Sequence, residues 1–335
     1  MADRFLQLPE TDRKAILDTA AQELGKSPNI LEKDVWVCWT LEKLATMPEV
    51  PSLAFKGGTS LSKAYDAIAR FSEDVDVTLD RRALDPNLDP FAATSKTQAK
   101  KICARLDALL ANYLVDAIKP YFDEHLKAEL HDGTAETKIG NSADKLHIPY
   151  PSCLESGASY LQESVLLELG GKNEITPSSQ LQLEPYIRSI VPSLEFPLPT
   201  VAVLAPERTY WEKATLIHAE CNRENAKANA ERLSRHWYDL FQLNRSEFGS
   251  AALSNTELLE EVVNQKNVLY PSGWAKYNDC LGSLRLIPDD SSLKSLGEDF
   301  DQMRANAMFW DEPETFQNIL DELSQLETSI NNMFA

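Results

Sequence analysis

Apolar residues recur along the chain with the periods of helices and strands, and these periods locate its secondary structure. Up to residue 204, a three-to-four-residue repeat predicts helices over residues 10–25, 30–47, 60–69 and 96–118, with a shorter helix ending near residue 130. Short apolar runs predict strands at residues 53–55, 75–79, 146–150, 164–169 and 200–204. Pro120 is expected to break the helix before it. Residues 131–144 show no period and are expected to be irregular.

The remainder of the chain is nearly all helical by the same criterion. Helices are predicted over residues 207–222, 224–243, 255–267 and 313–333. A proline-rich connection at residues 178–206 precedes them and holds one short helix at residues 185–190 besides the last strand. We therefore expect an α+β protein of two domains. Residues 1–205 would form the first, with a helical insertion at about 95–131, and residues 206–335 a mostly helical second domain.

The most informative local pattern joins a glycine turn to a pair of acids. The turn, residues 56–60, follows a predicted strand and opens a helix. Its glycines let backbone N–H groups approach a phosphate. Asp74 and Asp76 begin the next strand and are two residues apart, so their carboxylates point to the same side. Neighbouring carboxylates repel one another unless a cation lies between them, and Mg²⁺ and Mn²⁺ prefer such oxygen ligands.

Other interpretations of this pattern stay open. The two glycines are adjacent, which excludes a P-loop. A tight turn capped by Thr59 or Ser60 would give the same sequence, and acids on a surface strand often do no more than contact water.

Three residues farther along the chain could complete such a site. Glu168 lies in an apolar strand, where it either supplies the third carboxylate of a two-metal site or faces solvent. Lys213 and Asp239 lie on two predicted helices among apolar neighbours. They either form a structural pair that joins the helices or both point toward the strand acids.

Composition and charge limit the ligands and the location that can be expected for this protein. The chain has 335 residues and a net charge of −19, which argues against non-specific binding of nucleic acid by its whole surface. An RNA would have to bind through a local group of basic residues, most of which could equally be ordinary solvated helix positions. The candidates are Arg70, Arg81, Arg82, Lys96, Lys100, Lys101, Arg105, Arg223, Lys227, Arg232 and Arg235. The five cysteines are scattered, the N-terminus lacks a signal-peptide pattern, and no apolar run could span a membrane. A cytoplasmic protein with reduced thiols is expected.

Together these patterns resemble the AbiEii/AbiGii-type nucleotidyltransferase toxins of type IV toxin–antitoxin systems. The resemblance lies in residues 55–62, 70–77, 166–171, 207–218 and 235–240, and in the acidic-basic segment 32–34. It implies a DNA polymerase β-like nucleotidyltransferase core with a helical C-terminal domain. The reaction would move a nucleoside monophosphate from an NTP to an acceptor, with release of pyrophosphate. The resemblance also implies Mg²⁺ or Mn²⁺, the 3′ end of tRNA as acceptor, an antitoxin protein as partner, and a role in phage defence.

The site residues follow from the resemblance and the acid pattern together. The catalytic residues would be Asp74, Asp76, Glu168, Lys213 and Asp239, of which the first three would also be the metal ligands. The nucleotide would be bound by Lys56, Gly57, Gly58, Thr59, Ser60, Lys63 and Arg235. A threonine stands between the glycine and the serine of the family motif, so either hydroxyl could contact the phosphate.

Two other functions stay open. The same NTP chemistry could act on a protein hydroxyl instead of RNA. Alternatively, the protein could bind a nucleotide without releasing pyrophosphate and dock a partner through its helical tail. The adjacent carboxylates count against this second alternative, because a pure binding protein has little need for them.

Overall fold

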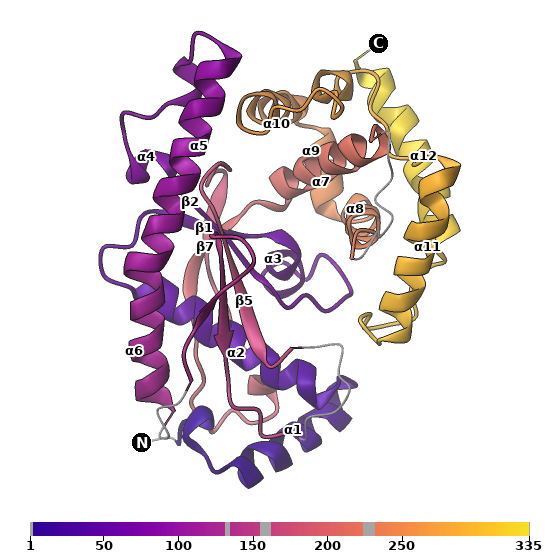
Figure 1. The fold of residues 1–335 in the computed structure, drawn as a ribbon. Coiled ribbons are helices and arrows are strands. Elements are labelled where there is room, and N and C mark those ends of the chain that lie inside the picture. The colour runs from indigo at the N-terminus through magenta and orange to yellow at the C-terminus, as the bar shows by residue number, and fades with distance from the viewer. Residues whose placement is uncertain (1–2, 131–134, 155–161, 224–231, 335) are drawn as a thin grey trace. The chain divides into compact units, whose positions relative to one another are not determined.

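The computed structural model describes residues 3–130, 135–154, 162–223 and 232–334. The chain divides into two compact units (Figure 1). The sheet unit contains residues 1–64, 71–88 and 104–203, and the helical unit contains residues 65–70, 89–103 and 204–335. The assignment of functional domains at residues 1–205 and 206–335 stays a prediction.

The sheet unit is built on a seven-stranded mixed sheet with the strand order β3-β4-β5-β2-β1-β7-β6. The strands are β1 (Leu53–Lys56), β2 (Val75–Leu79), β3 (Lys138–Ile139), β4 (Lys145–Pro149), β5 (Ser164–Gly170), β6 (Ser178–Gln182) and β7 (Thr200–Leu204). In the centre β2 pairs antiparallel with β1 and parallel with β5, which in turn pairs antiparallel with β4. The paired strands β1 and β2 are thus 19 positions apart along the chain (56 to 75), and β2 and β5 are much farther apart.

The two faces of the central strands differ, because side chains alternate along a strand. Along β4 and β5 every second residue is buried, and the residues between them are partly exposed. The helix α2 (Pro28–Thr46) packs against β2 and β5 and is almost wholly buried. Its partner α1 (Glu10–Leu24) packs on it, and both contribute to a core cluster with Phe5 and Ile187. The opposite, partly exposed residues of β2, β4 and β5 are therefore those available to a ligand.

The remaining helices up to residue 129 are α3 (Gly57–Lys63), α4 (Arg81–Leu84), α5 (Lys96–Tyr113) and α6 (Lys119–Glu129). Pro120 does not break the helical run as expected. A π-helical turn, Leu114–Ile118, joins α5 to α6 directly, and the proline is the second residue of α6. The regular hydrogen-bond pattern is already interrupted at a π-helical turn, which is where a proline can be accommodated. Figure 1 shows α5 and α6 as one long, nearly continuous rod.

The helical unit contains α7 (Pro206–Cys221), α8 (Arg235–Asn244), α9 (Glu247–Leu253), α10 (Thr256–Leu269), α11 (Asp290–Ala305) and α12 (Phe316–Met333). Residues 65–70 belong to this unit although they follow α3 in the chain. Ala69 accepts hydrogen bonds from the backbone N–H of Trp310 at 3.0 Å and from the hydroxyl of Tyr238 at 3.3 Å. The chain is thus α+β with a helical C-terminal region, as the sequence predicts.

Several boundaries differ from the predicted ones. The helix expected over residues 60–69 begins at Gly57 and ends at Lys63, because the apolar residues that follow pack in the helical unit. The helix expected over residues 224–243 is α8, which begins at Arg235, and the left-handed conformation of Arg232 lies just before it. The expected start of that helix, residues 224–231, lies outside the described residues.

Several elements lie outside the predicted ones. Strand β3 falls in the stretch 131–144 that the sequence predicts to be irregular, and helix α4 is only four residues long. Strand β6 is an edge strand with mostly exposed polar residues, so it has no apolar alternation to detect. Helix α11 buries only a few apolar residues within a polar run, and α9 is only seven residues long. Within the described residues, no helix is both long and apolar enough to cross a membrane. All five cysteines are free thiols.

Candidate active site

A row of four charged residues crosses the centre of the sheet. Lys56 of β1 is in register with Asp76 of β2, Asp76 with Glu168 of β5, and Glu168 with Lys145 of β4. Residues in register on neighbouring strands share a face, and all four are partly exposed. The sheet therefore brings two carboxylates together and flanks them with two ammonium groups. We call these four residues the carboxylate row.

The glycine turn lies directly against this row. Gly57 has φ +81°, which favours glycine, and a Cβ atom added to it would lie 2.1 Å from Oδ2 of Asp76. No other residue could occupy this position without moving the Asp76 carboxylate. The turn and the acid, 19 positions apart in the sequence, thus form one site.

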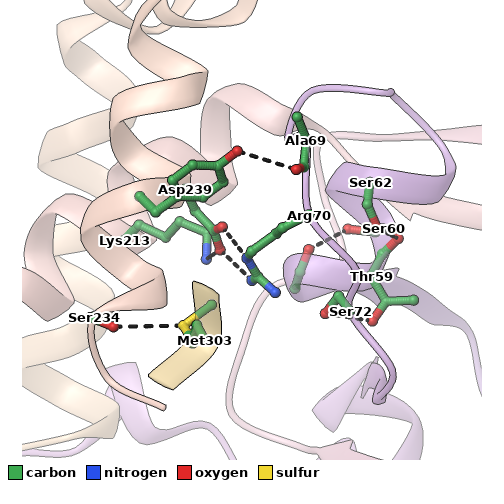
Figure 2. Close-up of polar contacts among 12 residues, drawn as sticks. Thr59, Ser60, Ser62, Ala69, Arg70, Ser72, Lys213, Ser234, Asp239 and Met303 are labelled. Atoms are coloured by element: carbon green, nitrogen blue, oxygen red, sulfur yellow. Dashed lines mark hydrogen bonds and ion pairs between the residues drawn. The ribbon is translucent and has the colours of Figure 1, made fainter. Parts of the chain in front are cut away.

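The hydroxyl groups of the turn are engaged within the sheet unit. Thr59 Oγ1 donates to the carbonyl oxygen of Asp74 at 2.5 Å and lies 2.9 Å from Ser72 Oγ (Figure 2). Ser60 Oγ donates to the carbonyl oxygen of Gly57 at 2.9 Å. Since a hydroxyl has one proton to donate, both side chains brace the turn and the start of β2. A phosphate at this turn would therefore meet backbone N–H groups first.

Lys145 is the cation of the row with a direct carboxylate partner. Its Nζ lies 2.5 Å from Oε1 of Glu168. Burial acts to lower the pKa of Lys145, but the hydrogen bond and charge of Glu168, with the charges of Asp144 and Asp74, raise it. Asp144 has a second unusual property. Its Oδ1 is buried and has no hydrogen-bond partner in the described part of the chain. Acid charge is thus concentrated around Lys145.

The donor types of this region suit a hard divalent cation. The carboxylates of Asp74, Asp76 and Glu168, and the buried oxygen of Asp144, are oxygen ligands of the kind Mg²⁺ and Mn²⁺ prefer. As the side chains stand, however, no three His, Cys, Asp or Glu residues among those described are grouped closely enough to hold a metal ion. Of the proposed ligands, the carboxylate of Glu168 lies against the ammonium group of Lys145.

The helical unit contains a second cluster of predicted site residues. The guanidinium of Arg70 contacts both carboxylate oxygens of Asp239, at 2.6 and 2.8 Å, and Lys213 Nζ lies 2.7 Å from Asp239 Oδ2. Figure 2 shows both cations directed at the Asp239 carboxylate. We call these three residues the Asp239 cluster. Lys213 and Asp239 thus pair between α7 and α8, and Arg70, which the sequence suggested as an RNA contact, is buried as their partner.

The pKa values in this cluster follow from burial and charge. Burial alone would raise the pKa of Asp239, but Arg70 and Lys213 hold it well below its ordinary value. Burial lowers the pKa of Lys213, against the opposing effect of Asp239, and the charges of Arg70 and Arg235 lower it further. Arg235, at the start of α8, therefore lies close enough to act on Lys213. The cluster carries more positive than negative charge.

Lys63 is engaged away from the glycine turn. Its Nζ lies 2.5 Å from Oδ1 of Asp34 and 2.9 Å from the carbonyl oxygen of Glu184, and it lies 4.4 Å from the centre of the Tyr186 ring. Both charged side chains are buried. This geometry gives Lys63 a structural role in fastening α3 to α2.

Sequence reasoning missed Lys145 and Asp144. The predicted strand began at residue 146, one position after Lys145. The alternation of β4 extends one residue farther back, since Lys145 and His147 are partly exposed and Leu146 and Ile148 are buried. That alternation is visible in the sequence, but its pairing with Glu168 depends on strand register.

Comparisons with known proteins were made for the whole chain. The family model described as nucleotidyl transferase AbiEii toxin, Type IV TA system, matches residues 39–322. Among solved structures, the chain is similar to MenT4, a nucleotidyltransferase toxin from Mycobacterium tuberculosis H37Rv, with a TM-score of 0.45 and 16% identity over 95% of this chain and 98% of that one. No curated protein sequence matches. The residues matched by the family model include the carboxylate row and the Asp239 cluster.

Proposed function

Because the chain belongs to the AbiEii family of nucleotidyltransferase toxins of type IV toxin–antitoxin systems, we propose that it transfers a nucleoside monophosphate from an NTP to the 3′ end of an RNA, with tRNA as the first candidate acceptor. One observation supports this most directly. The glycine turn touches the Asp76 carboxylate, and Glu168 stands in register beside it. A phosphate-binding turn and neighbouring acids are what an NTP and a divalent cation need together.

Three residues of the carboxylate row, together with Asp74 and the glycine turn, have separate roles in this proposal. Asp74, Asp76 and Glu168 would hold Mg²⁺ or Mn²⁺, which when bound supplies charge to the triphosphate and activates the acceptor hydroxyl. Backbone N–H groups at Gly57 and Gly58 would bind phosphate oxygens, since the hydroxyls of the turn are engaged elsewhere. Lys56, in register with Asp76, would offset phosphate charge at the edge of the row.

Lys213 and Asp239 stay proposed catalytic residues, and both belong to the buried Asp239 cluster of the helical unit. In this cluster Arg70 and Lys213 both contact the carboxylate of Asp239, and Arg and Lys are the residues that most often bind phosphate groups. Asp239 would act as a positioning residue that fixes Lys213. Lys63 has no part in the proposal, because its ammonium is buried against Asp34.

The test is transfer of label from each α-labelled NTP to total RNA in the presence of Mg²⁺. We expect the wild-type protein to label an RNA of defined size, and Asp76→Asn to lose about a hundredfold or more of the rate. Asp107→Asn is the matched control, because it removes only a pair with Lys172 and should keep full activity. An Asp76→Asn protein that transfers label as fast as the wild type would refute the proposal.

The same experiment separates the alternatives. Label that is removed by protease and resists nuclease would identify a protein hydroxyl as the acceptor. NTP binding without pyrophosphate release would favour a nucleotide-binding module. The net charge of −19 confines RNA contacts to local basic residues, so affinity for tRNA should fall as salt concentration rises. A type IV toxin also implies a cognate antitoxin as partner.

A further inference from the structure

Lys145, a residue that no sequence pattern pointed to, lies inside the carboxylate row. Its Nζ is 2.5 Å from Oε1 of Glu168, and the two side chains are 35% and 32% exposed, so both reach solvent. We propose that Lys145 is the resident counter-ion of the row: it holds Glu168 while no metal is bound, and it must release Glu168 before that carboxylate can serve as a metal ligand. This inference rests on the proposed function, since it takes the row as the metal site.

The charges around Lys145 favour such an exchange. Two further carboxylates act on it besides Glu168. The charged group consists of Asp74, Asp76, Asp144, Glu168, Lys56 and Lys145. Four carboxylates and two ammonium groups leave a net charge of −2, which one divalent cation would neutralise.

Asp144 offers the released ammonium group a second partner. Its Oδ1 is buried and, within the described residues, accepts no hydrogen bond. A buried carboxylate oxygen without a partner is costly, so an ammonium group that leaves Glu168 would be stabilised there. Asp144 directly precedes Lys145 in the chain, and its charge already acts on the Lys145 ammonium group.

The test is Mn²⁺ binding without nucleotide, measured by the electron paramagnetic resonance signal of free Mn²⁺. Lys145→Met removes the charge and keeps most of the stem. We expect it to bind Mn²⁺ about three- to tenfold more tightly, because repulsion between the ammonium and a divalent cation is lost. Lys145→Arg keeps the charge and should bind Mn²⁺ as the wild type does.

Lys119→Met is the matched control. Lys119 also forms a 2.5 Å pair, with Asp123, and its side chain is 29% exposed, but it lies on α6 outside the row. This variant should leave Mn²⁺ affinity unchanged. Unchanged or weaker Mn²⁺ binding by Lys145→Met would overturn the inference, since a lysine that only stabilises the site gives that result.

The two proposals fail in different ways. If Asp76→Asn abolishes Mn²⁺ binding while Lys145→Met keeps wild-type affinity, only the counter-ion role fails. If Asp76→Asn binds Mn²⁺ as tightly as the wild type, the metal site fails and the counter-ion role fails with it.

A second measurement does not depend on whether Lys145→Met folds. In ¹H–¹⁵N spectra of lysine ammonium groups in the wild-type protein, the Lys145 signal is identified by its absence from Lys145→Arg. It should shift when Mg²⁺ is added, whereas the Lys119 signal should stay in place. A Lys145 signal that does not move at saturating Mg²⁺ contradicts the release step.

Discussion

At the scale of single residues, the α-carbon of Gly57 faces the carboxylate of Asp76 so closely that any side chain would displace it. Two separate costs oppose a larger residue there. Its φ of +81° is unfavourable for L-residues, and an added Cβ would lie 2.1 Å from Oδ2 of Asp76. The first cost affects folding alone, whereas the second acts on a proposed metal ligand.

Three glycine substitutions separate these costs. Gly25 has a positive φ of +64° and open space around its α-carbon. Gly25→Ala should therefore lose only the backbone cost, about 1–2 kcal/mol of unfolding free energy. Gly57→Ala should lose at least about 3 kcal/mol, because overpacking adds to the backbone cost. Gly273→Ala, with neither problem, should be neutral. Urea unfolding measures all three.

Activity supplies the second readout for the same variants. Gly57→Ala should also lose nucleotidyl transfer, which Gly25→Ala should keep. Equal stability and activity in these two variants would show that Asp76 tolerates a neighbouring methyl group, and would remove the argument for a fixed turn beside the acid.

At this scale the sequence alone locates the acids and suggests the Lys213–Asp239 pair, but it does not indicate Lys145 and Arg70 as partners. Asp74 and Asp76 stand in one short motif, and Glu168 interrupts an apolar strand. The contact of Lys145 with Glu168 joins residues 23 positions apart, and that of Arg70 with Asp239 joins residues 169 positions apart. Such contacts depend on strand register and on packing of distant segments, for which the local pattern carries no signal.

At the scale of elements, α2 fastens three segments of the sheet unit through three consecutive charged residues. Glu32 accepts from the backbone N–H of Cys153 at 2.8 Å, and Asp34 pairs with Lys63 of α3. Lys33 lies 2.5 Å from Glu73, the residue before Asp74. Successive helical positions point about 100° apart, so one turn of α2 reaches all three. The helix α3, which begins at the glycine turn, and Glu73, which precedes Asp74, are therefore both held to the buried helix α2.

Lys33→Met tests this fastening. It leaves the buried Glu73 carboxylate without the ammonium it pairs with, so we expect a loss of about 3–5 kcal/mol of unfolding free energy. Amide hydrogen exchange at residues 72–74 should quicken more than at β7. Lys43→Met, on the same helix with a looser pair at 3.7 Å, should change stability by less than about 1 kcal/mol.

A double variant shows whether the lone charge is the cause. Adding Glu73→Gln to Lys33→Met should recover part of the loss, because no unbalanced buried charge is left. If the double variant is as unstable as the single one, packing of the lysine stem rather than its charge holds the segment.

Helices with a clear apolar stripe are the ones whose bounds the sequence predicts well. Helices α1, α2, α7, α10 and α12, with sustained apolar stripes, were placed within a few residues of their bounds. The helix after the glycine turn is shorter than predicted. Ala67 and Ile68 continue its apolar period in the sequence, but they are buried in the helical unit. An apolar period shows that a residue is buried and does not say against which part of the chain.

At the scale of the whole molecule, the helical unit draws on three separated stretches of chain. Residues 65–70 supply Arg70 to the Asp239 cluster, Ala69 as acceptor for Tyr238 and Trp310, and Tyr65 as an edge-to-face partner of Phe248. These contacts come from a segment that lies in the first half of the sequence. The predicted boundary between residues 205 and 206 rests on prolines and helical periods in the sequence, and it stays a prediction about functional domains.

A protein consisting of residues 206–335 alone tests whether that boundary marks an independent domain. It keeps Lys213 and Asp239 but lacks Arg70, so the buried carboxylate loses the two-pronged partner at 2.6 and 2.8 Å. Removing one partner of a buried pair costs about 3–5 kcal/mol, a large part of the stability of a domain of this size. We expect the fragment to unfold at lower urea concentration and less cooperatively than the full chain, as followed by circular dichroism.

Arg70→Met in the full chain should reproduce part of this loss of unfolding free energy. A fragment that unfolds cooperatively at the midpoint of the full chain would show that residues 65–70 are dispensable to the helical unit.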